Sequence, residues 1–157
     1  MSGTTPTRQE ALDLVLQYNE TDSLVNHAKA VEAAMRYMAR KTGADEEMWG
    51  AIGLVHDLDY EKFPAQHCHK TEAILRENDW PEDYIRAVLS HGWCICTDIE
   101  PQSLVEKTLY TVDELAGFVS ACALVRPSKS VQDLEVKSVK KLSLIHISEP
   151  TRPRLIS

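Results

Sequence analysis

The sequence is organised around residues 52–60, Ile-Gly-Leu-Val-His-Asp-Leu-Asp-Tyr. In this stretch an apolar run ends in an imidazole and a carboxylate, His56 and Asp57. Both groups are costly to bury in a hydrophobic core, whereas both are good ligands for a divalent metal ion. The pattern therefore predicts a metal site at the end of a buried helix.

Further candidate ligands lie far from this pair along the chain. Each occurs on the flank or at the end of a predicted helix, where its side chain can point inward: His27, His67, His91 and Asp113. Helix bundles assemble metal sites from such inward side chains on several helices. A single inward histidine is more often a core residue, so the prediction rests on the whole set.

Composition limits the class of protein. The chain has 157 residues, enough for one domain, and its 43% hydrophobic and 26% charged content is typical of a soluble globular protein. A net charge of −7 argues against binding a nucleic-acid polymer, but it allows a small anionic substrate beside a bound cation. No bilayer-spanning run or signal pattern occurs, so we expect a cytoplasmic protein without a membrane partner.

The cysteines show no paired motif. None of the four belongs to a Cys-x-x-Cys pair, and no secretory signal accompanies them: Cys68, Cys94, Cys96 and Cys122. This pattern predicts free thiols. A structural zinc site built on Cys94 and Cys96, with Cys68, His69 and His91 in reach, is an alternative, although a Cys-x-Cys pair alone is a weak zinc signal.

Apolar periodicity and capping residues predict an all-α bundle. The expected helices cover about 7–18, 23–41, 45–57, 67–77, 82–90, 102–125 and 130–142. No stretch alternates as a strand does, so the prediction is a compact bundle of about six to seven helices with the metal site in its core.

The C-terminal residues differ from the rest. Residues 143–157, beginning Ser-Leu-Ile-His-Ile-Ser-Glu-Pro, resemble translated sequencing-adapter DNA. We expect 142–157 to be a non-native or disordered tail, so His146 is not counted as a ligand.

The order His27, His56-Asp57, Asp113 resembles the HD-domain (HDIG-type) superfamily of metal-dependent phosphohydrolases over about residues 23–141. The flanking segments look like those of small bacterial HD-domain proteins, which continue beyond Lys137–Lys141 with further helices. The resemblance implies a domain over 23–141 that is shortened at its C-terminus, with 1–22 as an N-terminal helix and lead-in.

The resemblance also assigns ligands. It implies one metal on His27, His56, Asp57 and Asp113, and a second on His67, His91 and a bridging Asp57. His69 remains an alternative to His67. The ions, one or two, would be Mn, Fe, Co, Mg, Ni or Zn.

The implied activity is hydrolysis of a phosphorylated small molecule or nucleotide by metal-activated water, with Asp57, Asp59 and Lys70 as catalytic candidates. In a mononuclear site Asp59 or Glu61 would act on the water. Lys70 is favoured for phosphate binding because it follows His67 by three residues in the predicted helix; other candidate cations are Lys62, Arg126 and Lys129.

Two other functions remain open. Some relatives with this ligand set are iron-dependent oxygenases of small molecules, so the resemblance also allows a diiron oxygenase. A non-catalytic metal-binding regulatory module is the third reading. Loss of ligands would favour such a module, and the sequence retains the core set His27, His56, Asp57 and Asp113.

Overall fold

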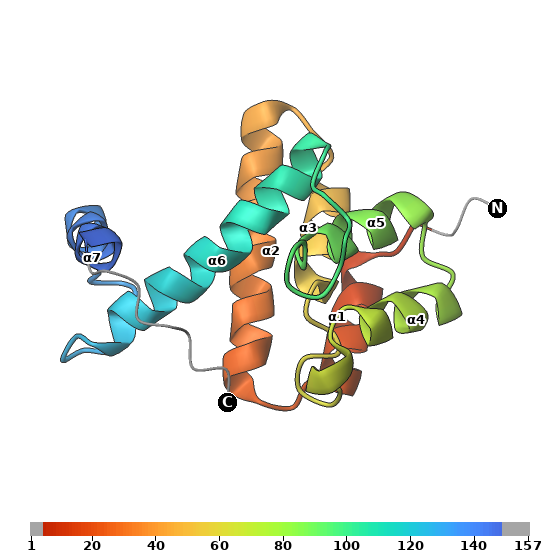
Figure 1. Ribbon diagram of the computed structural model, residues 1–157, viewed down its shortest axis with the longest axis horizontal. Helices are drawn as coiled ribbons and strands as arrows, with labels where there is room; N and C mark the ends of the chain where they lie inside the picture. Colours follow the sequence, from red (N-terminus) through yellow and green to blue (C-terminus); the bar gives the residue numbers. More distant parts are fainter. Residues whose placement is uncertain (1–4, 149–157) are drawn as a thin grey trace. The chain divides into compact units, whose positions relative to one another are not determined.

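The computed structural model describes residues 5–148, and over this range the chain is built from α-helices. They are α1 (Arg8–Tyr18), α2 (Asp22–Thr42), α3 (Glu46–Val55), α4 (His69–Glu77), α5 (Glu82–Ser90), α6 (Leu104–Leu124) and α7 (Val136–Ser148), with a 3₁₀ turn η1 (Pro64–Gln66) before α4 (Figure 1). Within residues 5–148 the β-structure is limited to one isolated bridge between Trp93 and Thr97. The predicted all-α class is confirmed.

The chain divides into two units, residues 1–116 and residues 117–157. The first holds α1 to α5 and the first part of α6, and it contains all six predicted metal ligands. The domain limits expected at residues 22 and 141 stay a prediction.

Local side-chain chemistry fixes the ends of the first three helices. Thr7 and Glu10 form a reciprocal capping box that opens α1, and Asp45 Oδ1 accepts hydrogen bonds from the backbone N–H groups of Glu47 and Met48 at the start of α3. Gly43 ends α2 in a left-handed conformation, φ 72°, that costs glycine little. These signals are local, which is why the sequence predicted the limits of these three helices well.

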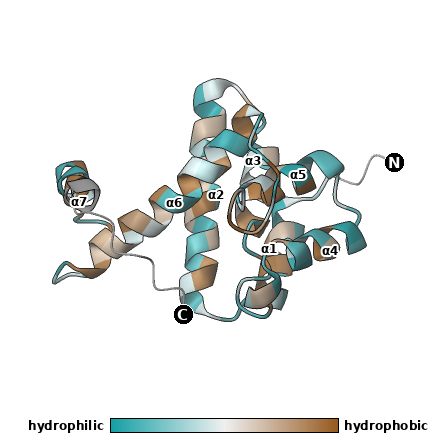
Figure 2. Cartoon of the chain, viewed as in Figure 1, coloured by the Kyte–Doolittle hydropathy of each residue, from teal (hydrophilic) through white to brown (hydrophobic). Residues whose placement is uncertain are grey.

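Helix α3 forms the centre of the first unit. It packs against α1, α2 and α5, and every residue from Trp49 to Val55 is buried. Helix α2 carries both hydrophobic and hydrophilic residues along its length (Figure 2), and Val31 and Met35 are among its buried ones. The apolar burial of α3 holds the chain segment that leads directly into His56 and Asp57.

A buried carboxylate joins α1 to α2. Glu32 is 4% exposed and accepts hydrogen bonds from Arg8 Nε at 2.6 Å and Arg36 Nε at 3.0 Å. Because both partners are guanidinium groups, the buried charge is compensated and α1 is held on the bundle.

Two expected helix starts were wrong. Helix α4 begins at His69 and not at His67, because Cys68 has a left-handed φ of 68° that interrupts helical geometry. Helix α7 begins at Val136 and not near Ser130, because serine side chains there bind the backbone locally: Ser128 Oγ accepts from the N–H of Ser130, and Ser130 Oγ accepts from that of Gln132.

Helix α7 also continues six residues beyond its expected end at residue 142, so residues 143–148 of the expected tail are helical. Residues 149–157 lie outside the described range. The adapter-like origin of this tail stays a prediction. None of the helices in the described part of the chain is long and apolar enough to cross a membrane.

Gly53 allows α3 to approach α2 closely, and this contact generates a stability prediction. A Cβ at Gly53 would lie 3.2 Å from the backbone N and Cα of Glu32, whereas one at Gly117 in α6 would meet nothing within 4 Å. We expect Gly53→Ala to lower the free energy of unfolding by about 1–3 kcal/mol, and the control Gly117→Ala to raise it by up to about 1 kcal/mol. Urea unfolding measures both, and equal effects would contradict the tight α2–α3 contact.

Candidate metal centre

Four of the predicted ligands converge from three helices. His27 comes from α2, His56 and Asp57 follow the end of α3, and Asp113 comes from α6. Their donor atoms all lie within 4.8 Å of one another. We call these four residues the first ligand group.

A second group shares one residue with the first. The donor atoms of Asp57, His67 and His91 also lie within 4.8 Å of one another, and we call these three residues the second ligand group. Asp57 Oδ2 is 3.4 Å from His56 Nε2, while Asp57 Oδ1 is 3.3 Å from His91 Nε2 and 3.6 Å from His67 Nε2. The two oxygens of one carboxylate therefore face different groups.

The imidazole rings form a continuous series through the centre. Ring centroids are 5.3 Å apart for His27 and His56, 5.2 Å for His56 and His91, and 5.3 Å for His91 and His67, each pair edge to face. The two ligand groups are thus neighbours in one cluster.

Backbone carbonyls fix the orientation of the two most buried rings. Nδ1 of His56 lies 2.8 Å from the carbonyl oxygen of Gly53, and Nδ1 of His91 lies 2.5 Å from that of Val88. A carbonyl only accepts, so each Nδ1 carries the proton and, in the neutral ring, each Nε2 carries a lone pair.

The surroundings of the Nε2 atoms of His56 and His91 fit a bound cation. Among the described side chains these two atoms are buried nitrogens without a hydrogen-bond partner, and each faces a carboxylate. Lone pairs turned towards carboxylate oxygens repel unless a cation lies between them or the ring gains a proton. The donor set of neutral imidazoles and carboxylates suits a divalent ion.

His67 is oriented by a buried carboxylate. Asp59, which is 0% exposed, places Oδ1 2.7 Å from His67 Nδ1, and its Oδ2 accepts the N–H of Thr71 at 2.8 Å. A carboxylate on the far nitrogen of a metal-binding histidine fixes its tautomer and ring angle. Asp59, a catalytic candidate from the sequence, is placed behind His67, with both oxygens engaged.

The electrostatics of the metal-free cluster show strong mutual pairing. Complete burial disfavours a charged His56, yet the carboxylates of Asp57 and Asp113 outweigh this and raise the pKa of His56 well above 6.5. Burial alone would raise the pKa of Asp57, but His56 and His91 lower it well below 3.8. His27 and His56 likewise overcome the burial of Asp113 and lower its pKa.

His67, and not His69, lies beside Asp57. His69 is exposed and lines a pocket on the side of Cys94 and Thr97. Lys70 cannot share a helical face with His67 as expected, because His67 precedes α4; its Nζ lies 5.3 Å from the ring centroid of Phe63.

The other candidates from the sequence belong to neither ligand group. Glu61 accepts hydrogen bonds from the N–H groups of Glu20 and Thr21 between α1 and α2, and Lys62 donates to the carbonyl oxygen of Gln17. Arg126 and Lys129 belong to the second unit.

The expectation of four free thiols was wrong for two of them. Cys68 and Cys96 form a disulfide across 28 residues, while Cys94 and Cys122 are free. This pairing also corrects the zinc alternative, because Cys96 is joined to Cys68 and Cys94 is exposed. Neither the disulfide nor the Asp59–His67 pair has a local sequence signal, since both depend on loops brought together by the bundle.

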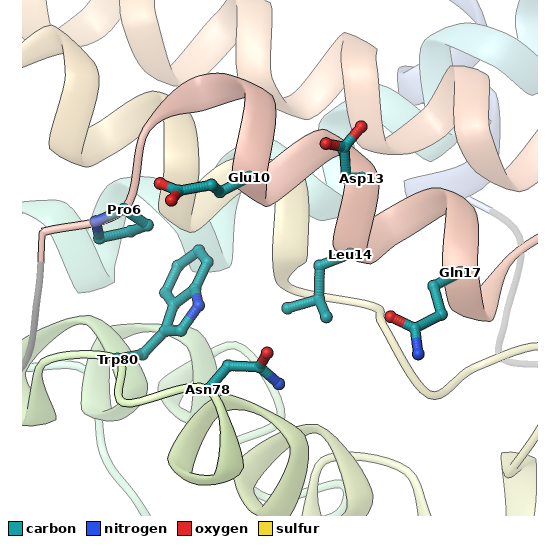
Figure 3. A pocket seen from close by; sticks show the side chains of 7 residues that line it. All are labelled: Pro6, Glu10, Asp13, Leu14, Gln17, Asn78 and Trp80. Atoms are coloured by element: carbon teal, nitrogen blue, oxygen red, sulfur yellow. The ribbon is translucent and has the colours of Figure 1, made fainter.

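A separate pocket of about 300 Å³ lies between α1 and the turn after α4. Figure 3 shows Trp80 pointing towards α1, where Glu10, Asp13 and Leu14 line the other side. None of its lining residues belongs to either ligand group.

The Asp59–His67 pair generates a prediction about metal affinity. Both oxygens of Asp59 accept hydrogen bonds, one from His67 and one from the N–H of Thr71. In Asp59→Asn one of these oxygens becomes an NH₂ group that cannot accept. The side chain can then no longer satisfy both partners, and His67 loses its fixed orientation. We expect the second ligand group to bind Mn²⁺ about 10–100-fold more weakly, with the first group little changed. Calorimetric titration measures this, with exposed Asp13→Asn as control, and equal weakening of both groups would contradict the assignment.

Comparison with known proteins identifies the family of this chain. Over 87 residues the chain is 40% identical to a tRNA (cytidine(56)-2'-O)-methyltransferase of Thermoplasma volcanium; the match covers 55% of this chain but 26% of that protein, so the chain spans about a quarter of that relative's length. No solved structure matches the chain. The HD domain family model matches residues 24–117, more than half of the chain, and this span includes every member of both ligand groups. The chain therefore belongs to the HD-domain family.

Proposed function

We propose that this protein is a metal-dependent phosphohydrolase that cleaves a phosphate ester or nucleotide. The observation that carries the proposal is Asp57, whose Oδ2 faces His56 and whose Oδ1 faces His67 and His91. A carboxylate shared in this way can hold two divalent ions side by side, the arrangement used for in-line displacement at phosphorus. The metal identity is open among Mn, Fe, Co, Mg, Ni and Zn.

The residues of the chain have distinct tasks in this proposal. Bound ions would supply an activated water molecule and neutralise charge that develops on the phosphoryl oxygens. Asp57 joins the two ligand groups, and the Gly53 and Val88 carbonyls hold the rings of His56 and His91 in one tautomer. Asp59 acts as a positioning residue through His67.

Exposure suggests the side from which substrate reaches the centre. The side chains of His56 and His91 are 0% and 4% exposed, whereas those of Asp57 and His67 are 21% and 19% exposed. His27 and Asp113 are similarly exposed, at 20% and 23%. A phosphoryl group would therefore approach over these four side chains and not over His56 or His91. Lys70, half-buried over Phe63, is proposed as its cationic partner.

The methyltransferase relative does not alter this proposal. The match covers 26% of that protein, and transfer of a methyl group calls for a site that holds a methyl donor. The two ligand groups offer nitrogen and oxygen donors for ions instead. Together with the net charge of −7, this favours a small phosphorylated substrate.

A diiron oxygenase is the second candidate, because the same imidazole and carboxylate donors also suit iron. Protein loaded with Mn²⁺, Co²⁺ or Fe²⁺ separates the two. Phosphate release from a panel of nucleotides and esters supports the hydrolase, whereas O₂ consumption with an organic substrate and no phosphate release supports the oxygenase. Metal binding with neither activity supports a regulatory module.

Asp57→Ala tests the shared ligand. Loss of this carboxylate removes a donor from both groups, so we expect metal content to fall and the hydrolysis rate to drop on the order of 100–1,000-fold or more. Elemental analysis and phosphate release measure the two effects, with Asp13→Ala as a control distant from both groups. Full metal content in Asp57→Ala would remove the central proposal.

Metal binding should weaken as pH falls. In the metal-free protein burial lowers the pKa of His67, but Asp59 and Asp57 raise it overall, and the pKa of His56 is also raised. A metal ion must displace the proton from each of these histidines. Each displaced proton therefore lowers the metal affinity about tenfold for every pH unit below the pKa of that histidine. Mn²⁺ titrations between pH 6 and 8 should show proton release and tighter binding at higher pH.

Stability of the metal-free protein should change in the opposite sense. A histidine with a raised folded pKa contributes its full stability below the unfolded value of 6.5 and loses it as pH rises through the folded pKa. Thermal unfolding with chelator should therefore show a falling midpoint from pH 6 to 8, while excess Mn²⁺ reverses the trend. A falling midpoint in both conditions would contradict metal binding at these histidines.

A further inference from the structure

The disulfide Cys68–Cys96 joins the two chain segments that carry His67 and His91. We propose that it is a reversible thiol–disulfide modification site, which reacts with low-molecular-weight thiols and their disulfides and thereby controls how His67 and His91 are held together. The effect on metal binding rests on the proposed second ligand group. The modification itself does not.

On one side the disulfide restrains His67. Cys68 follows His67 in the chain, is fully buried, and has a left-handed φ of 68° that is unfavourable for a non-glycine residue. Helix α4 begins at the next residue. Breaking the covalent link releases the short connection between His67 and α4.

On the other side the disulfide contacts the residue after His91. A Cβ on Gly92 would overlap both sulfur atoms, so only glycine fits there without a shift. The carbonyl oxygen of Gly92 also accepts the N–H groups of Ile95, Cys96 and Thr97 at 3.0, 2.9 and 3.0 Å. Cys96 is therefore tied through this turn to the end of α5 and His91.

A reagent can reach one sulfur of the pair. Cys96 is partly exposed and lines a pocket of about 390 Å³ with His69, Cys94 and Thr97, whereas Cys68 is 0% exposed. An incoming thiolate forms a bond to Cys96 Sγ, the Cys68–Cys96 bond breaks, and Cys68 leaves as a thiolate that takes a proton. A second thiol attacks the mixed disulfide and releases the Cys96 thiol and an external disulfide, so two electrons pass to the protein.

Reduction changes the surroundings of His67. Donor atoms of His67, Cys68 and Cys96 lie within 4.8 Å of one another, so two thiols become available beside the imidazole. His67 then loses its covalent restraint and gains competing partners. Both changes weaken its alignment with Asp57 and His91.

The modification is tested first by counting thiols in the full chain. The protein is equilibrated with reduced or oxidised glutathione and alkylated, and its mass is then measured by mass spectrometry. We expect a difference of two alkyl groups, mapped to Cys68 and Cys96, retained in Cys94→Ser and absent in Cys96→Ser. Equal alkylation in both conditions, or a pair that includes Cys94 or Cys122, would overturn the proposal.

The coupling is tested on metal-free protein by hydrogen exchange. We expect the amides of residues 67–72 and 91–97 to exchange faster after reduction and in Cys96→Ser, and unchanged exchange would overturn the coupling. Mn²⁺ titration then compares the two states, with at least about tenfold weaker binding at the second ligand group after reduction. If the oxidised protein binds no Mn²⁺ but hydrogen exchange still differs between the oxidised and reduced protein, the proposed metal function is refuted and the modification stands.

Discussion

The sharing of Asp57 between two sets of histidines is the interaction on which the rest of the centre depends. One oxygen faces His56 and the other faces His67 and His91, so the two ligand groups cannot be separated without moving this carboxylate. The backbone at Asp57 is placed by α3, which is buried along its whole C-terminal part. The packing of the core therefore also sets the geometry of the site, and Gly53 contributes to both.

Burial strengthens the electrostatic interactions within the centre. His56 is wholly buried and His91 nearly so, and in such surroundings charges interact more strongly than in water. The metal-free cluster compensates by pairing imidazoles with carboxylates, which raises the pKa of His56 and lowers those of Asp57 and Asp113. A divalent ion can replace those protons, because the unpartnered Nε2 atoms already face the carboxylates.

The second ligand group is supported by more than its own three residues. Asp59 fixes the ring of His67, and the Cys68–Cys96 disulfide joins the loop of His67 to the turn after His91. The first ligand group comes from α2, α6 and the end of α3, and it has no such covalent link. Regulation through a thiol reaction would thus act on one half of the centre, with Asp57 as the point where the halves meet.

The sequence by itself determined the helical class, the helix ends near Thr7 and Gly43, and the choice of His56 and Asp57 as candidate ligands, because helix periodicity, capping and ligand chemistry are local properties. Only the tertiary structure decided that His67 and not His69 faces Asp57, that Asp59 lies behind His67, and that Cys68 pairs with Cys96. These contacts join loops 8 to 28 residues apart. Their geometry follows from the packing of α3, α4 and α5, which no local pattern encodes.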